Sequence, residues 1–202
     1  RSSAASDVYK RQLFALAAGC APTQKPLTDY VNPLLGTATL WDSVDLGFKP
    51  TKRTWGAEVF PGSSLPNAMV QVSPVTKFHS GAGYQYEDSV IYGFTHTNKG
   101  HWNLCHIPLL PVTGTPLPGD YCSPYSHARE SAAPGYYRVF LDRYGVDAEL
   151  TSTLRCAFHK YTYPAGAQAA LLADLQRSNE HVRAWDIRKE GDNAFALSLI
   201  HI

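Results

Sequence analysis

The feature that most constrains the fold is an alternation of apolar and polar residues between Tyr136 and Thr151. Apolar residues occupy every second position on both sides of a turn at 142–145, first as Tyr137, Val139 and Leu141 and then as Val146, Ala148 and Leu150. Successive side chains of a strand point to opposite faces of the sheet, so a period of two is the pattern of a half-buried strand. The segment therefore predicts a hairpin with one dry face.

Shorter segments of similar character fill most of the remaining chain. Alternating, β-branched or aromatic residues predict further strands at 70–74, 89–97, 106–113, 154–158 and 181–189, the last ending at a turn over 191–193. Short strands at a spacing of roughly 8–12 residues indicate an all-β protein built as a sandwich or a barrel. Because Tyr30 to Ala196 contains no repeat or linker, we expect residues 30–196 to form one β-sandwich of antiparallel strands.

Two segments leave room for interpretation. Pro108 and Pro111 mark 106–113 as an edge strand or an irregular one, because proline cannot donate a hydrogen bond to a ladder. The alanines and leucines of 167–175 would suit a helix, but the segment is short and lies between turn signals. We therefore favour a buried strand there.

Both ends of the chain stand apart from this pattern. Residues 1–12 and 197–202 resemble translated sequencing adapters, the alternative being an ordinary polar start and an ordinary last strand. The apolar run 13–19 followed by Cys20 resembles the end of a bacterial lipoprotein signal, in which Cys20 carries the lipid; the alternative is a stray apolar patch before a linker. We expect residues 1–29 and 197–202 to lie outside the domain.

A lipoprotein is exported and then held at a membrane by its lipid rather than by a helix. We therefore expect the periplasm or the outer cell surface as the compartment. The chain has no apolar run of about 18 residues, the length needed to span a membrane.

Composition narrows the range of ligands. Lysine and arginine together number 18 and aspartate and glutamate 17, which gives a formal net charge of +1. This balance provides no basic face for nucleic acid. Because 12% of the residues are aromatic, the chain suits an uncharged ligand better than a phosphate polymer.

Cysteines and histidines give no clear metal or disulfide pattern. Beyond Cys20 the chain has an odd set of cysteines, Cys105, Cys122 and Cys156, which leaves one disulfide possible and its pairing open. Free buried thiols are the commoner outcome in apolar strands such as the one that holds Cys156. The nearest approach to a metal cluster is His96, His101, Cys105 and His106. Its spacing matches no recognised zinc pattern, so we assign no metal and interpret the segment as a polar loop beside a ligand groove.

The usual catalytic motifs are missing from the sequence. Gly62 to Pro66 is not a nucleophile elbow, and Gly81-Ala82-Gly83 lacks the third glycine and the helix of a dinucleotide loop. Glycoside hydrolysis usually needs two carboxylates across a cleft. The candidates are Glu58, Glu87, Asp88 and Glu130, and their spacing marks no acid–base pair, so we interpret each as a solvated or turn-bonding group.

Aromatic residues carry the clearest hint of a ligand. An aromatic ring can stack on the apolar face of a sugar while His and Asn bond its hydroxyls. Tyr92 and Phe94 lie in an apolar strand and are expected in the core. Trp102 stands among Gly100, His101 and Asn103, so we expect it in an irregular loop that contacts a ligand.

Several segments together resemble the N-terminal domain of glycoside hydrolase family 92. They occur in the family's order between about Tyr30 and Leu175. They are VNPLLGT at 31–37, VFPG at 59–62, LPNAMVQ at 65–71, GFTHT at 93–97, PVTG at 111–114, APGYY at 133–137 and FHKY at 158–161.

The resemblance implies a calcium-dependent, inverting exo-α-mannosidase that acts on mannose-containing glycans. In this family a β-sandwich packs on an (α/α)6 barrel, which holds the catalytic acid, the catalytic base and the calcium ligands. The expected partner of this chain is therefore a barrel in cis, with Ca2+ bound there and no catalytic residue or cofactor in residues 30–196. On its own the chain is expected to be inactive.

The family resemblance also assigns a substrate-contacting loop to the sandwich. By the order of motifs this is the loop after His96-Thr97, so Lys99, His101, Trp102 and Asn103 become the candidate substrate contacts. Many family members have a glycine-rich or Asp-Tyr-Gly sequence there, from which this chain departs. A different class of function, a stand-alone carbohydrate-binding or adhesion module of a surface lipoprotein, remains the alternative.

Overall fold

The computed structural model describes residues 25–39, 47, 57–98, 104–116 and 119–201. The chain divides into two compact units, 1–30 and 31–202. Of the first, the described part is a short 3-10 helix, η1 (Leu27–Tyr30), where Nζ of Lys25 donates to the carbonyl oxygen of Asp29 at 3.1 Å. No described helix is long and apolar enough to cross a membrane.

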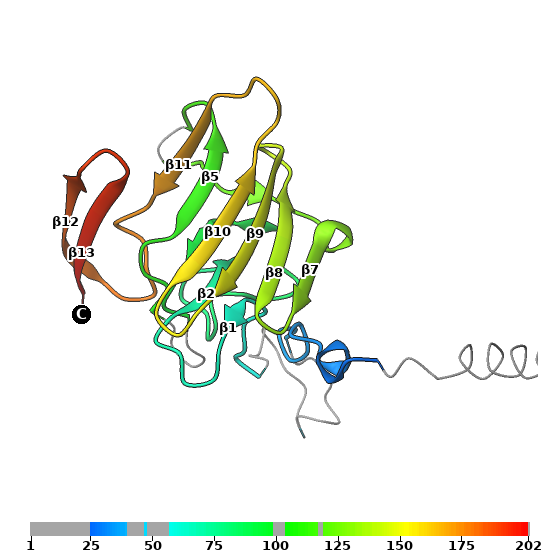
Figure 1. Ribbon diagram of the computed structural model, residues 1–202. Helices are drawn as coiled ribbons and strands as arrows, with labels where there is room; N and C mark the ends of the chain where they lie inside the picture. Colours follow the sequence, from blue (N-terminus) through cyan, green and yellow to red (C-terminus); the bar gives the residue numbers. More distant parts are fainter. Residues whose placement is uncertain (1–24, 40–46, 48–56, 99–103, 117–118, 202) are drawn as a thin grey trace, which may run out of the picture. The chain divides into compact units, whose positions relative to one another are not determined.

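The second unit is a β-sandwich of antiparallel strands (Figure 1). One sheet has the order β1-β2-β4-β5-β11, with β1 at Ser63–Ser64, β2 at Gln71–Val75, β4 at Gly93–Thr95, β5 at Leu109–Thr113 and β11 at Ala169–Ala173. The other has the order β10-β9-β8-β7, with β7 at Glu130–Ala133, β8 at Tyr136–Leu141, β9 at Val146–Ser152 and β10 at Ala157–Thr162. The predicted fold class is confirmed.

Two small pairs of strands and a second short helix complete the unit. Strand β3 (Val90–Ile91) pairs with β6 (Ser123–Pro124), and β12 (Val182–Glu190) forms a hairpin with β13 (Ala194–His201). The 3-10 helix η2 (His127–Arg129) precedes β7 and is capped by the Ser126 hydroxyl, which accepts a hydrogen bond from the Ala128 amide.

The predicted hairpin is the β8–β9 pair. Tyr137 lies opposite Leu150 and Leu141 opposite Val146. Its inward residues are almost wholly buried, and they meet Val72, Phe94 and Leu110 of the other sheet. The alternation therefore defines one half of the core, and Phe94 is buried as expected.

Three strand predictions need correction. Residues 89–97 form two strands in different sheets, β3 and β4, which are separated by Tyr92, and Gly93 begins β4. A Cβ on Gly93 would lie 2.9 Å from Cβ of Pro108, so only glycine allows the chain to cross there. Strand β5 is not an edge, but β4 pairs with it only at Leu109. Pro111 therefore faces β11 alone and interrupts no second ladder.

The third correction concerns the outer strands. The predicted 154–158 strand starts later, as β10, because hydrogen bonds between Thr153 and Cys156 close a turn. That turn shifts the inward positions by one, so Phe158 is 70% exposed and Cys156 is exposed rather than buried. Segment 167–175 contains the predicted strand, β11, but the expectation that it is buried is wrong, since Leu171 is 52% exposed.

The strand predicted at 181–189 is β12, and β13 follows the predicted turn. Residues 197–201, which the sequence sets apart as adapter-like, extend β13 in the structure. That pairing leaves their origin untested. Cys105, Cys122 and Cys156 are all free, Cys105 buried.

A buried carboxylate lies where the two sheets and η2 meet. The side chain of Glu130 is 0% exposed. Tyr137 Oη donates to its Oε1 at 2.5 Å, Tyr84 Oη lies 2.9 and 3.1 Å from its two oxygens, and His127 Nδ1 is 2.5 Å from Oε2. The other ring nitrogen of His127 lies 2.7 Å from the Tyr86 carbonyl oxygen, so each ring nitrogen faces an oxygen acceptor. The expectation of a solvated or turn-bonding Glu130 is thus wrong.

Two histidines also meet between the sheets. His96 follows β4 and His159 lies in β10, with their Nε2 atoms 2.8 Å apart and Nδ1 of His159 2.7 Å from Tyr161 Oη. One ring must donate and the other accept, which two neutral imidazoles can do. Burial lowers the pKa of both rings, that of His159 to about 4 with a smaller contribution from His96.

We predict that Tyr137→Phe destabilises the fold much more than Tyr136→Phe. The first change removes a donor from the buried Glu130 carboxylate and should lower the free energy of unfolding by about 1.5–3 kcal/mol. The hydroxyl of Tyr136 instead bonds Glu149 at 2.7 Å, on the outer face, and its loss should cost under about 1 kcal/mol. Urea unfolding of both variants measures the difference, and equal losses would contradict the anchoring role of Glu130.

We also predict a loss of stability in mild acid that depends on His159. Its ordinary pKa is 6.5 and its pKa in the fold is about 4. Between these values the unfolded chain takes up a proton that the folded chain does not, so the free energy of unfolding falls as the pH falls. His159→Gln should show a shallower fall between pH 7 and pH 5 in urea unfolding. Parallel curves for the two proteins would disprove the assignment.

Candidate functional site

The predicted substrate contacts lie outside the described residues. Lys99, His101, Trp102 and Asn103 fall in the segment 99–103, and Cys20 falls in 1–24. The structure does describe the residues on both sides of the loop, Asn98 and Leu104 to His106, and these can be built up from their contacts.

Asn98 fixes the first end of the loop. It is fully buried, and its Nδ2 donates to the carbonyl oxygens of Thr95 and Gln71 at 2.9 and 3.0 Å. Its Oδ1 accepts from Oγ1 of Thr95 at 3.0 Å and lies 3.7 Å from Sγ of Cys105. Because Cys105 belongs to the second end, this amide connects the two ends of the loop.

The second end is backbone held in an uncommon conformation. Cys105 and Ile107 have φ of 45° and 50°, a left-handed geometry that costs a non-glycine residue about 1–3 kcal/mol. His106 lies between them. Its backbone amide donates to Oγ1 of Thr97 at 3.1 Å, and the Nε2 atom of its ring lies 2.9 Å from Oε2 of Glu180. These contacts hold the segment on both sides.

Asn179 joins this end to a third segment. Its amide donates to the carbonyl oxygen of Leu104 at 3.2 Å. Its side chain accepts from the amide of His79 at 2.6 Å and donates to the carbonyl oxygen of Ser80 at 3.2 Å. His79 also has a left-handed backbone, with φ of 56°. Asn179 therefore connects the turn at 76–80, through its side chain, with the residues that follow the predicted loop, through its backbone amide.

An open pocket of about 590 Å³ lies between the 76–80 turn and the segment 176–182. The sequence analysis did not find it, because its two sides are a hundred residues apart. It is lined by Thr76, Lys77, Phe78, His79, Tyr92, Gln176, Arg177, Ser178, Glu180, His181 and Val182. Glu180 is the single carboxylate among them, so the pocket does not hold the paired carboxylates of a glycosidase.

The other carboxylates considered from sequence have partners elsewhere. Glu87 accepts from the amide and hydroxyl of Thr39 at 2.7 and 3.2 Å, and Asp88 accepts from the hydroxyl of Thr76 at 2.8 Å. The neighbouring carboxylates thus bond to different segments of the chain.

The histidines and Cys105 are not arranged as the sequence grouping suggested. His96 pairs with His159, whereas His106 pairs with Glu180. Burial lowers the pKa of His106, and the Glu180 carboxylate opposes this shift. Burial raises the pKa of the Cys105 thiol to about 12, so it is a neutral thiol at pH 7 and a poor metal ligand. His101 lies outside the described residues.

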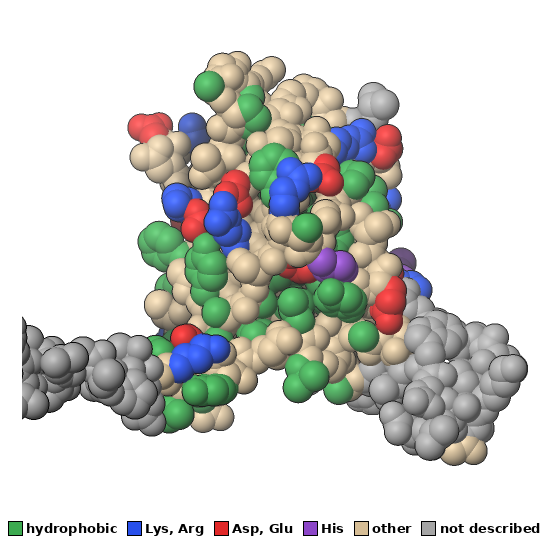
Figure 2. All heavy atoms as spheres, turned by 90° about the vertical axis from the view of Figure 1, so that its right-hand side faces the viewer, with side chains coloured by type: hydrophobic (Ala, Val, Ile, Leu, Met, Phe, Trp, Pro, Cys, Tyr) green, Lys and Arg blue, Asp and Glu red, His purple; other side chains and the backbone are tan. Residues whose placement is uncertain are grey.

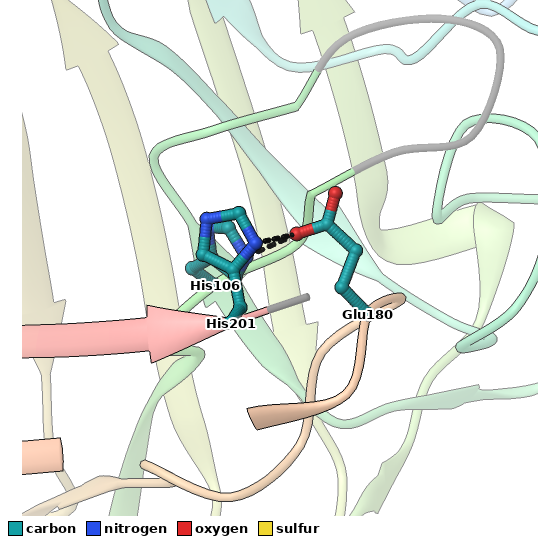
Figure 3. Close-up of side chains that lie close together, drawn as sticks. All are labelled: His106, Glu180 and His201. Atoms are coloured by element: carbon teal, nitrogen blue, oxygen red, sulfur yellow. Dashed lines mark hydrogen bonds and ion pairs between the residues drawn. The ribbon is translucent and has the colours of Figure 1, made fainter. Parts of the chain in front are cut away.

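A different set of metal-ligating atoms does come together. The ring nitrogens of His106 and His201 converge on Oε2 of Glu180 (Figure 3), and the three ligand atoms lie within 4.8 Å of one another. Two imidazoles and a carboxylate are a known ligand set for zinc. His201, however, belongs to the 197–202 segment that the sequence sets apart from the domain. Within residues 30–196 the set has two members, His106 and Glu180.

Comparison with known proteins identifies the fold. The sequence model of the glycosyl hydrolase family 92 N-terminal domain matches residues 30–196. No curated protein gives a match. Among solved structures, the chain is similar to the family GH92 α-mannosidase BT3965 of Bacteroides thetaiotaomicron in complex with mannoimidazole, with 32% identity and a TM-score of 0.68 over 80% of this chain and 21% of that one.

Two further structures agree. They are the GH92 family glycosyl hydrolase ccman5, at 26% identity and a TM-score of 0.64 over 85% of this chain and 24% of that one, and the family GH92 inverting mannosidase BT2199 of B. thetaiotaomicron VPI-5482, at 26% identity and 0.59 over 75% and 20%. The chain thus spans about a fifth to a quarter of the length of these relatives. The family match and the shared sandwich together show that residues 30–196 belong to the glycosyl hydrolase family 92 N-terminal domains.

Proposed function

We propose that this chain is the N-terminal part of an exo-α-mannosidase that acts on mannose-containing glycans, and that its 99–103 loop contacts the substrate. Family membership carries the proposal, and a solved relative binds mannoimidazole. The contacts beside the loop support it. Asn98 and His106 are held by side chains from other segments, which is how a rigid scaffold positions a binding loop.

In this proposal Trp102 supplies the stacking surface for a sugar ring, and Lys99, His101 and Asn103 bond its hydroxyls. The chemistry belongs to another part of the longer enzyme, an (α/α)6 barrel with the catalytic acid and base. The lone carboxylate in the pocket, Glu180, fits this division, since hydrolysis with inversion needs a second carboxylate to activate water. One relative is named an inverting mannosidase.

Exposed apolar side chains supply the surface on which such a barrel would pack. Phe158 of β10, Leu171 of β11 and Phe195 of β13 are 70%, 52% and 62% exposed. Large apolar residues that are exposed on outer strands are candidates for an interaction surface. The barrel would cover part of this surface in cis.

Calcium in this proposal is bound by the barrel, where it would orient the mannose hydroxyls; none of the described residues of this chain is assigned to it. The chain is placed outside the cytoplasm, as a lipoprotein anchored through Cys20 in the periplasm or on the outer surface. That placement rests on the sequence of residues 13–20 alone.

We predict that Trp102→Ala in the longer enzyme lowers kcat/KM on α-mannosides by roughly tenfold or more, because stacking on a base or sugar face contributes about 1–3 kcal/mol. Trp102→Phe keeps an aromatic face and should recover most of the activity. Thermal unfolding should be the same for both variants. Unchanged kinetics for Trp102→Ala would remove the loop from the substrate site.

We further predict that EGTA abolishes the activity of the longer enzyme and that added Ca2+ restores it. The same additions should leave the melting temperature of this 202-residue chain unchanged, since a ligand stabilises only the fold that binds it. A rise in melting temperature with Ca2+ would place the metal in this domain. Micromolar binding of methyl α-mannoside by the chain alone would favour the carbohydrate-binding module instead.

A further inference from the structure

We propose that the pocket between the 76–80 turn and the 176–182 segment binds a negatively charged group, a phosphate, sulfate or carboxylate carried by a glycan. The identification of the carrier as a glycan rests on the proposed function; the anion site itself rests on the residues of the pocket.

The basic side chains of the lining are the first observation. Lys77 and Arg177 line the pocket together with the imidazoles of His79 and His181. Lys77, His79 and His181 are exposed, and none of these side chains forms a hydrogen bond or ion pair with the rest of the described chain. Three donors thus point into or border one open space without protein acceptors.

The outer face of the β7–β10 sheet shows the contrast. Several basic residues on and beside this sheet pair with acidic ones. Figure 2, which views the molecule from the right-hand side of Figure 1, shows blue and red side chains next to one another. Arg138 pairs with Asp147, Lys160 with Glu149 and Arg129 with Asp142. These three cations are paired with acids, whereas Lys77 in the pocket has no acidic partner among the described residues.

The side chain of Arg177 is held in place by two aromatic rings and an aspartate. Its guanidinium lies 5.7 Å from the Tyr92 ring centre and 5.2 Å from that of Tyr121. Its Nε lies 3.7 Å from Oδ2 of Asp174, whose Oδ1 accepts from the Gln176 and Arg177 amides. A cation packed on two aromatic rings loses little conformational freedom on binding, and guanidinium donors match the oxygens of phosphate and carboxylate.

The one acid of the pocket is already engaged. Oε2 of Glu180 lies 2.9 Å from Nε2 of His106 and also contacts His201. The lining thus holds one carboxylate, Glu180, against Lys77, Arg177 and two further imidazoles, and Asp174 offsets part of the charge of Arg177. The excess of basic groups in the lining makes the pocket attractive to an anion.

The position of the pocket suggests what carries the anion. Asn179 and Glu180, on one side of the pocket, also contact Leu104 and His106 beside the predicted sugar-contacting loop. A glycan that reaches that loop would place a neighbouring sugar near the pocket. A charged substituent on this sugar, or a charged leaving group, fits Lys77 and Arg177, with Phe78 offering an apolar surface.

The test titrates the 202-residue chain at low salt with inorganic phosphate, inorganic sulfate, and glucuronate against glucose, by calorimetry or protein NMR. We expect binding of phosphate and sulfate, and of glucuronate but not glucose. Lys77→Gln should weaken anion binding by roughly tenfold, since it removes one charged hydrogen bond. Lys160→Gln, which removes a paired surface lysine, should have no effect.

Equal affinity for glucose and glucuronate, or equal losses for the two lysine variants, would overturn the anion site. Raising the salt to about 1 M should abolish binding, because screening acts on exposed charges. The result is independent of the proposed function: anion binding in a protein indifferent to Trp102→Ala would retain the pocket and reject the mannosidase loop. Loss of activity in Trp102→Ala without anion binding would do the reverse.

Discussion

The sandwich depends on one buried carboxylate. Glu130 begins β7 and is wholly excluded from solvent, yet three side chains from different parts of the chain bond it. A charge in that position is tolerable only with such a set of donors, because desolvation of an unpaired carboxylate costs several kcal/mol. Burial and the charge of Glu130 in turn raise the pKa of Tyr84 and Tyr137, which keeps both hydroxyls protonated as donors. The network fixes the β7–β10 sheet to the segment before β3, and so sets the register of the two layers.

In contrast to this well-bonded core, the backbone beside the predicted loop is strained. Among the described residues, five non-glycine residues have a left-handed backbone, and three of them, His79, Cys105 and Ile107, lie at this end. Their strain persists because side-chain amides hold the neighbouring backbone: the buried Asn98 bonds both sides of the loop, and the partly buried Asn179 bonds the 76–80 turn. Strained non-glycine residues cluster where a structure presents binding groups. The stability of the core thus offsets the strain of these left-handed residues.

Sequence alone predicted the sandwich and the β8–β9 hairpin, because period two is a local signal that packing cannot easily override. The prediction failed at Phe158 and Cys156, because one tight turn shifted which residues of the strand point inward. It also failed at Pro111, because β4 ends before this residue and so requires no backbone N–H donor from it. Glu130 looked solvated because its partners Tyr84 and Tyr137 come from separate segments. The family resemblance located a loop, while the pocket required residues a hundred positions apart to be brought together.

The net charge of the chain likewise does not reveal how its charges are arranged on the surface. A net charge of +1 indicated an uncharged ligand, and for most of the surface the reasoning holds, since Arg138 and Lys160 face acids across the sheet. A sum over the chain cannot register which charges face one another, however. The acids of the sheet are paired with neighbouring bases, whereas Lys77 in the pocket has no ion pair with a described residue. Lys77 and Arg177 line the same pocket, and a nearly neutral protein can therefore still select an anion.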